Sequence, residues 1–109
     1  MTVNALFTVV AEPNRRRILD LLRDRERPVG ELVQALDVAQ PTVSKHLKVL
    51  REVGLVEFRV EGRRRVYTLR AEPLFAVDAW LAPYRVRWAR RLEALERHLE
   101  TMPDEGDPA

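Results

Sequence analysis

Two amphipathic helical patterns separated by only three residues constrain the fold of this chain more than any other feature. Apolar residues recur at steps of three and four in residues 29–36 and again in residues 40–53. Pro28 stands where the first turn of a helix accepts proline, and Asp37, between the patterns, tolerates the left-handed backbone of a tight turn. Two helices joined by so short a turn predict a helix-turn-helix, whose second helix enters the major groove in DNA-binding proteins.

The second pattern, residues 40–53, has the composition of a DNA-recognition helix. Val43, Leu47 and Leu50 fall on one narrow apolar stripe. The residues that project away from this stripe carry hydroxyls, an amide and cations, which suit base edges and phosphates. They are Gln40, Thr42, Ser44, Lys45 and Lys48. Gly54 and the apolar Leu55 predict a left-handed end to the helix, whereas Ala39 offers no side-chain cap at its start.

An alternating pattern follows Gly54 and predicts a β-hairpin. Val56, Phe58 and Val60 share one face, Glu61-Gly62 supplies the turn, and residues 66–69 return. The arginines at or just past the tip are Arg63, Arg64 and Arg65. A solvated loop would also satisfy three arginines, but beside a recognition helix we favour contact with the phosphate backbone or a narrow minor groove.

Two further helices are expected before the helix-turn-helix. The spacing of Val3, Leu6, Phe7 and Val10 predicts the first, over about residues 3–11, with Pro13 closing it. The second runs from Asn14 to Arg23 and is followed by a charged linker, residues 24–27. It opens with three arginines, residues 15–17, for which a solvated surface and phosphate contact are both open interpretations.

A long amphipathic helix, about residues 73–101, is expected to join two copies of the chain. Its apolar stripe is longer than a small winged domain can cover, and an uncovered stripe of this kind indicates a partner surface. With two residues of the first helix, the expected dimer interface is Leu6, Phe7, Val77, Trp80, Leu81, Tyr84, Trp88, Leu92, Leu95 and Leu99. The alternative is that the stripe folds back on its own domain.

The charge distribution favours a polyanionic partner more than the net charge of +2 does. Residues 40–70 hold eight basic side chains against three acidic ones, whereas residues 93–109 hold six acidic ones against Arg97. The chain of 109 residues suits one domain, and no apolar run approaches the roughly 20 residues that cross a bilayer. The absence of a signal-like start and of cysteine agrees with an expected cytoplasmic location.

Several segments together resemble the ArsR family of bacterial winged helix-turn-helix regulators. They are residues 11–22, the Gln-Pro-Thr-Val-Ser-Lys-His-Leu-Lys-Val-Leu-Arg run of residues 40–51, Gly54-Leu55-Val56 and residues 61–67. The resemblance implies a cytoplasmic homodimer, joined by its first and last helices, that binds a palindromic operator and usually represses. Its recognition positions correspond here to Gln40, Thr42, Ser44, Lys45 and His46, with Lys48 on a phosphate and residues 62–65 as the wing. Pro41, within the same run, is also expected to contact DNA.

The chain departs from the metal-sensing members of that family. Residues 31–36 lack the cysteine pair of one type, and Trp80 and Arg91 stand where the last-helix site of another type has histidine. We therefore expect no metal site and no cofactor, with a weak site at His98 as an open alternative. Trp80, Tyr84 and Trp88 are assigned to the dimer core rather than to an effector pocket. No nucleophile–base motif or phosphate-binding glycine loop indicates an enzyme.

These observations predict a mainly α fold with a β-hairpin wing, a winged helix-turn-helix of about five helices. The domain would span residues 1–102 and end in an acidic disordered tail, residues 103–109. The expected function is that of a homodimeric repressor, with helix 40–53 in the major groove of a near-palindromic operator and wing 61–66 on the flanking backbone or minor groove. The alternatives are a regulator, even an activator, gated by a metal or small molecule, and a protein-interaction adaptor.

Overall fold

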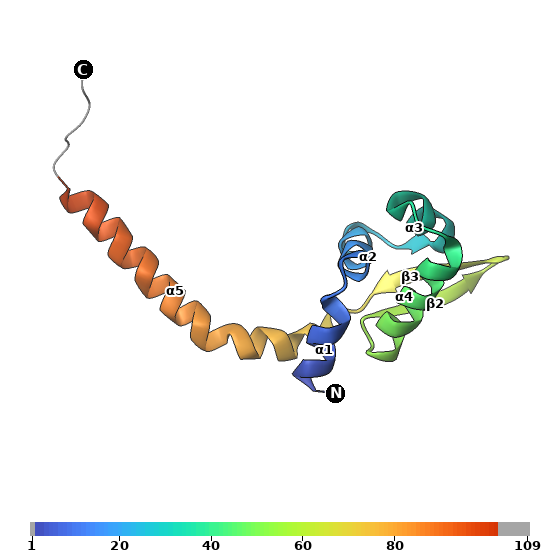
Figure 1. Ribbon diagram of the computed structural model, residues 1–109, viewed down its shortest axis with the longest axis horizontal. Coiled ribbons are helices and arrows are strands. Elements are labelled where there is room, and N and C mark those ends of the chain that lie inside the picture. Colours follow the sequence, from blue (N-terminus) through green and yellow to red (C-terminus); the bar gives the residue numbers. More distant parts are fainter. Residues whose placement is uncertain (1, 103–109) are drawn as a thin grey trace, which may run out of the picture. The chain divides into compact units, whose positions relative to one another are not determined.

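The computed structural model describes residues 2–102, in which five α-helices accompany three short strands and one 3-10 turn (Figure 1). The elements are α1 (Val3–Val10), α2 (Pro13–Asp24), β1 (Arg27–Pro28), α3 (Val29–Leu36), α4 (Gln40–Glu52), β2 (Val56–Glu61), β3 (Arg64–Leu69), η1 (Glu72–Leu74) and α5 (Phe75–Thr101). They confirm the expected mainly α fold with a hairpin wing. They form two compact units, one ending at Val77 and one beginning at Asp78. The expected tail, residues 103–109, lies outside the described residues.

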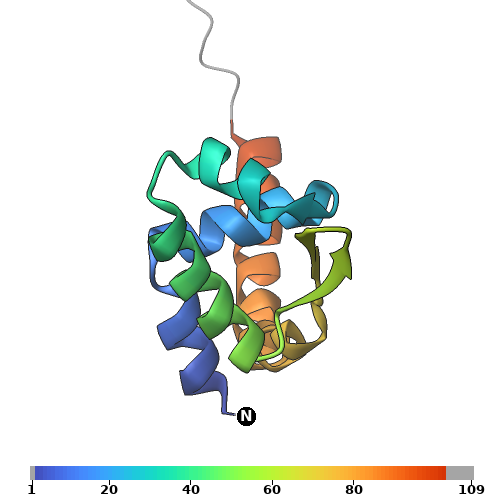
Figure 2. The same cartoon turned by 90° about the vertical axis from the view of Figure 1, so that its right-hand side faces the viewer.

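The first unit is built around the helix-turn-helix. Helices α2, α3 and α4 contact one another, while α1 packs on α2 and the sheet packs on α3 and α4 (Figures 1 and 2). Val43, Leu47 and Leu50 of α4 are at most 1% exposed, in one cluster with Ile18 and Leu32. The apolar stripe predicted for α4 is therefore the side of the helix that faces the core.

The turn and the end of α4 have the geometry expected from their residues. Asp37 closes α3 with a left-handed φ of 56°. At the end of α4, Gly54 has a φ of 80°, the Leu55 N–H donates to the Leu50 carbonyl at 2.9 Å, and Leu55 itself is fully buried. This is a Schellman motif, in which the residue after glycine anchors the end of the helix in the core.

The sheet contains a strand that the sequence did not indicate. Strand order is β1-β3-β2, and β1 pairs Arg27 with Tyr67 and Pro28 with Val66. The expectation of a plain linker over residues 24–27 was therefore wrong for Arg27, and Pro28 precedes α3 as its N-cap instead of opening it. Proline is compatible with this place because β1 is an edge strand and so needs few backbone donors.

The hairpin of β2 and β3 projects beyond the core (Figure 1). Its two-residue loop is Gly62-Arg63, and Gly62 takes a positive φ of 64°, as the first loop position of a type II′ turn requires. Burial falls toward the tip, from 2% exposure at Val56 to 68% at Val60. The alternating pattern thus continues past the point where the domain can cover its apolar side chains.

The three arginines at the start of α2 are bound to backbone carbonyl groups. Arg15 donates to the Val9 carbonyl, Arg16 donates to Val10 and Ala11 at 2.6 and 3.1 Å, and Arg17 donates to Ala35 at 3.0 Å. These carbonyls lie at the C-terminal ends of α1 and α3, where helices leave acceptors unpaired and favour positive charge. The run therefore caps the C-terminal ends of α1 and α3. This role differs from both the solvated surface and the phosphate contact that the sequence left open.

The second unit consists of α5 from Asp78 to Thr101. The helix begins at Phe75, after η1, and not at Pro73 as expected. It continues through Pro83, which cannot donate the helical hydrogen bond at that position. No residue of α5 is buried in the described chain. None of the helices in residues 2–102 combines the length and apolar character that crossing a membrane requires.

The missing cap of α4 gives a stability prediction. Ala39 has the extended backbone of an N-cap, with a ψ of 144°, but its side chain offers no acceptor. Ala39→Ser should therefore raise the free energy of unfolding by about 1 kcal/mol, because the hydroxyl satisfies an amide of the first turn. Urea denaturation would measure this. The control Ala35→Ser makes the same change inside α3 and should be neutral or slightly destabilising.

Candidate nucleic-acid interface

The polar face of α4 is exposed where its sequence predicts. Among the expected DNA-binding residues of this helix, the exposed ones are Gln40, Pro41, Thr42, Ser44, Lys45 and Lys48. Because Val43, Leu47 and Leu50 anchor the opposite side in the core, this face cannot rotate inward without exposing the buried stripe. The helix therefore presents an amide, two hydroxyls and two cations on a rigid support.

A cleft of about 630 Å³ joins this face to the wing. It is lined by Val29, Gly30, Gln40, Ser44, Lys48, Arg51, Arg63, Arg64, Arg65 and Tyr67. Three predicted residues of α4 and all three predicted wing arginines thus lie around one concave surface. Five of the lining side chains are cations, so this surface, which we call the basic cleft, suits a polyanion.

Sequence reasoning missed Arg51 as a site residue. Gln40, Ser44, Lys48 and Arg51 follow one another at steps of four, four and three residues, so they form one helical stripe. That spacing was available from the sequence. The contribution of Tyr67, Val29 and Gly30 was not, because it depends on how α3 and the sheet pack beside α4.

The three wing arginines line the same cleft, but their side chains leave the hairpin in different directions. Successive residues of a strand point to opposite faces of the sheet. Arg65 accordingly lies over the Phe58 ring, 4.7 Å from its centroid, while Arg64 lies 3.5 Å from the Glu61 carboxylate. Arg63 occupies the loop. The run of three therefore divides between the two faces of the hairpin and its tip.

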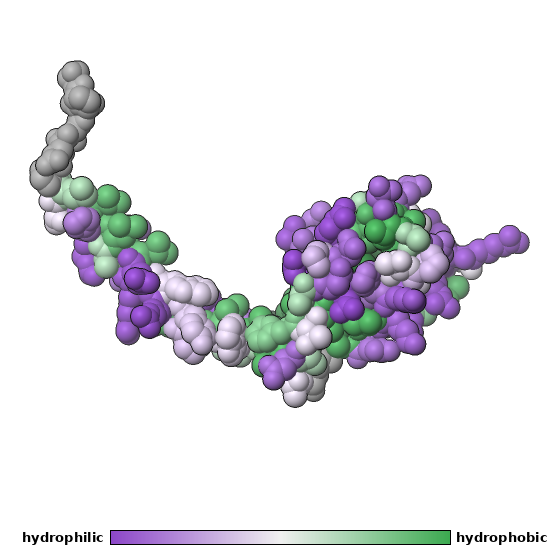
Figure 3. Space-filling model, in the orientation of Figure 1, coloured by the Kyte–Doolittle hydropathy of each residue, from purple (hydrophilic) through white to green (hydrophobic). Residues whose placement is uncertain are grey.

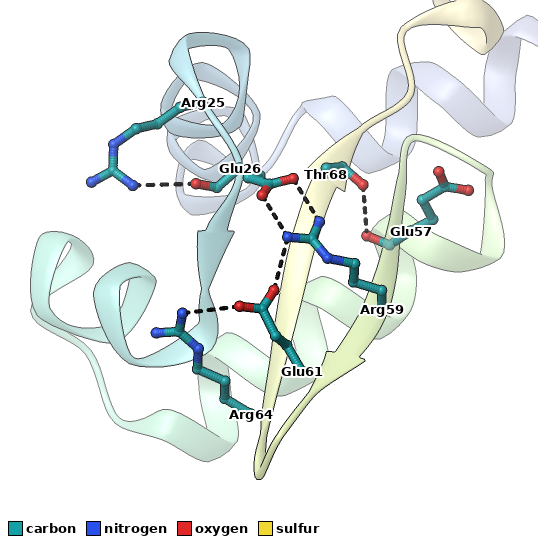
Figure 4. Close-up of polar contacts among 7 residues, drawn as sticks. All are labelled: Arg25, Glu26, Glu57, Arg59, Glu61, Arg64 and Thr68. Atoms are coloured by element: carbon teal, nitrogen blue, oxygen red, sulfur yellow. Dashed lines mark hydrogen bonds and ion pairs between the residues drawn. The ribbon is translucent and has the colours of Figure 1, made fainter.

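An arginine–carboxylate network covers the face of the sheet that carries Arg64 (Figure 4). Arg59 of β2 donates to both oxygens of Glu26 at 2.6 Å and to Glu61 at 2.9 Å. Glu26 immediately precedes β1, so this pair reaches across the middle strand β3. The hydrogen bonds from Arg59 lower the pKa of Glu26, and those that Arg59 donates to Glu26 and Glu61 raise its own pKa.

His46 has a different environment from the rest of the α4 set. Its side chain is 14% exposed; Nδ1 accepts a hydrogen bond from Arg15 Nε at 3.2 Å, and Nε2 lies 3.6 Å from a Glu12 oxygen. Glu12 also caps α2 by accepting from the Arg15 amide. His46 thus packs against the start of α2, and its expected contact with DNA stays a prediction.

The residues expected at a dimer interface fall into two groups. Leu6 is 1% exposed and lies in the core of the first unit, so it offers no surface for a partner. Most of the α5 set is exposed, at 47% for Trp80, 50% for Trp88 and 60% for Leu92. In Figure 3, hydrophobic side chains line one side of the C-terminal part of α5. Within residues 2–102, no group of three metal-ligating side chains gathers at His98 or elsewhere.

Comparisons with known proteins point to one class of regulator. The family described as bacterial regulatory protein, arsR family, matches residues 12–57. The HTH-type transcriptional regulator Rv2034 of Mycobacterium tuberculosis is 39% identical over 93% of this chain and 89% of its own length. The transcriptional repressor SdpR of Bacillus subtilis is 27% identical over 72% of this chain and 88% of its own length. The solved structure of an ArsR-like transcriptional regulator from Rhodococcus sp. RHA1 has a TM-score of 0.68 at 28% identity, covering 94% of this chain and all of that one.

The Glu26–Arg59 pair gives a prediction about pH. A carboxylate with a lowered pKa in the folded state stabilises the fold above its unfolded pKa, and this contribution is lost as the pH falls through the folded value. The carboxyl of Glu26, followed by NMR, should therefore titrate below its ordinary value of 4.5. Arg59→Gln should move this midpoint upward, whereas Arg23→Gln, an exposed change on α2, should leave it in place. An unchanged midpoint in Arg59→Gln would contradict the network.

Proposed function

Because the chain belongs to the ArsR family of bacterial regulatory proteins and is a DNA-binding transcriptional regulator, we propose that it represses transcription as a homodimer on a near-palindromic operator. The basic cleft carries this proposal. It joins side chains that can read bases with cations that can hold the backbone, on elements anchored in one core. Two such surfaces, related by a two-fold axis, match the symmetry of a palindrome.

In the proposed complex, α4 lies in the major groove. Gln40 and Ser44 contact base edges, because an amide and a hydroxyl can both donate and accept. Lys48 contacts the backbone, and Arg63 and Arg65 follow it along the wing. The start of α4 carries no side-chain cap, so the positive end of its dipole is free to face a phosphate.

The dimer is proposed to form through α5. The side chains of Trp80, Tyr84 and Trp88 stack along the helix, with ring centroids 5.1 and 6.4 Å apart. Leu92, Leu95 and Leu99 continue the same side at 52–60% exposure. A stripe of this length left in water would be unusual, and a second copy of α5 would cover it. An antiparallel crossing would also bring the arginines of residues 85–91 near the glutamates of residues 93–100.

Substitutions on α4 should separate backbone contact from base reading. Lys48→Ala should weaken binding to an enriched operator and to unrelated DNA alike, and lower the salt slope of log affinity by about one. Gln40→Ala should instead relax preference at one base pair, by roughly 1–3 kcal/mol of discrimination. Fluorescence anisotropy with duplexes selected by the wild-type protein from a random library would measure both.

The control for these variants is Arg23→Ala, which removes an exposed cation from α2 and should leave both quantities unchanged. Affinity that does not depend on salt would overturn the proposed mode of binding. So would a Gln40→Ala protein with the same base preferences as the wild type.

A charge placed in the α5 stripe should separate the subunits. Leu92→Asp should convert the dimer into a monomer, because burying an unpaired carboxylate in an apolar interface is costly. Sedimentation velocity would record the change in mass. Val60→Asp makes a comparable change at an exposed wing residue and should leave the assembly intact. A monomeric wild-type protein at micromolar concentration would refute the proposed dimer.

A further inference from the structure

We infer that Phe58 is a positioning residue for DNA binding, holding Arg51 of α4 and Arg65 of β3 over one aromatic ring so that both cations face the same stretch of DNA backbone. The guanidinium carbons of Arg51 and Arg65 lie 4.9 and 4.7 Å from the centroid of the Phe58 ring. Both arginines line the basic cleft. The inference rests on the proposed function, since it assumes that this cleft holds DNA.

The core of the first unit holds the ring in place. Phe58 pairs with Tyr67 across the hairpin, and their rings lie 5.4 Å apart at an angle of 41°. Tyr67 is only 5% exposed, and Phe58 packs against the main hydrophobic cluster. A ring fixed in this way restricts the side chains that rest on it, so less conformational freedom is lost when those side chains bind.

The ring orders these two arginines without cancelling their charge. Among residues 2–102, no carboxylate lies within 4.0 Å of Arg51 or Arg65, whereas Arg59, Arg64 and Arg70 each pair with a glutamate. A carboxylate would also fix a guanidinium, but it would compete with a phosphate for the same donors. An aromatic face attracts a cation through its quadrupole and leaves its N–H groups free. The side chains of Arg51 and Arg65 are thus held in position by the ring and remain available to a phosphate.

The ring also sets the spacing between two elements. Arg51 is near the end of α4 and Arg65 is on the wing, so only the packing of the hairpin against α4 brings them together. Because Phe58 contacts both arginines, and both line the basic cleft, it links the recognition helix to the wing beside the cleft. Loss of this contact should loosen the wing relative to α4 without removing any charge from the protein.

The inference can be tested by changing the quadrupole of the Phe58 ring while keeping the shape of the side chain. Trifluorophenylalanine at position 58 preserves apolar packing but removes most of the attraction for cations. The full-length protein with this change should bind a library-selected duplex roughly tenfold more weakly, since two arginine side chains that the ring no longer holds must then be immobilised on binding. Thermal unfolding should be close to that of the wild type. The same replacement of Phe75, which is 71% exposed and outside the cleft, should have no effect.

A double-mutant cycle shows whether Phe58 acts through the two arginines. Phe58→Leu should weaken binding in the wild-type background but not in an Arg51→Ala, Arg65→Ala background, because the cations that it positions are then absent. Phe58→Tyr, which retains a ring, should restore affinity. An equal loss in both backgrounds, or unchanged affinity with the fluorinated ring, overturns the inference. A wild-type protein that binds none of the duplexes would instead overturn the proposed function, and with it this inference.

Discussion

The burial of one narrow stripe on α4 is the constraint on which the rest of the structure depends. Val43, Leu47 and Leu50 have almost no exposed surface, and each would lose roughly 1.5–3 kcal/mol of apolar burial if the helix turned outward. The Schellman motif at Gly54 and Leu55 holds the end of the helix in the same orientation. The direction of Gln40, Ser44 and Lys48 is therefore a consequence of core packing.

Arginines serve three physical roles in this small domain, and their surroundings decide which. Those of residues 15–17 donate to the carbonyls at the ends of α1 and α3 and so complete those helices. Arg59 and Arg64 are held by glutamates on one face of the sheet. Arg51 and Arg65 rest on Phe58 and keep their charge unpaired. A count of positive residues does not separate these three groups. Of the three, only the pair Arg51 and Arg65 keeps its donors available to a polyanion.

Periodicity was sufficient to predict most of the elements and the exposed face of α4, because apolar spacing reflects the core that each helix must meet. It did not reveal β1, since two residues ending in proline carry no alternating pattern. It also grouped Arg64 with Arg65, which the pleat of β3 directs to opposite faces. His46 lies beside Arg15 and Glu12 through a contact between distant segments that no local pattern encodes. The cleft could be anticipated through Gln40, Ser44, Lys48 and the wing arginines, but not through Tyr67, whose place in it depends on how the sheet packs beside α4.

The ion pair between Glu26 and Arg59 crosses the middle strand of the sheet and so connects the two outer strands through side chains. Strand β3 is bonded to both neighbours through its backbone and bridged over one face by this pair. The pair therefore adds a side-chain link between β2 and the segment that leads into β1. Since β1 runs directly into α3, this link connects the wing to the first helix of the helix-turn-helix as well as to its own sheet.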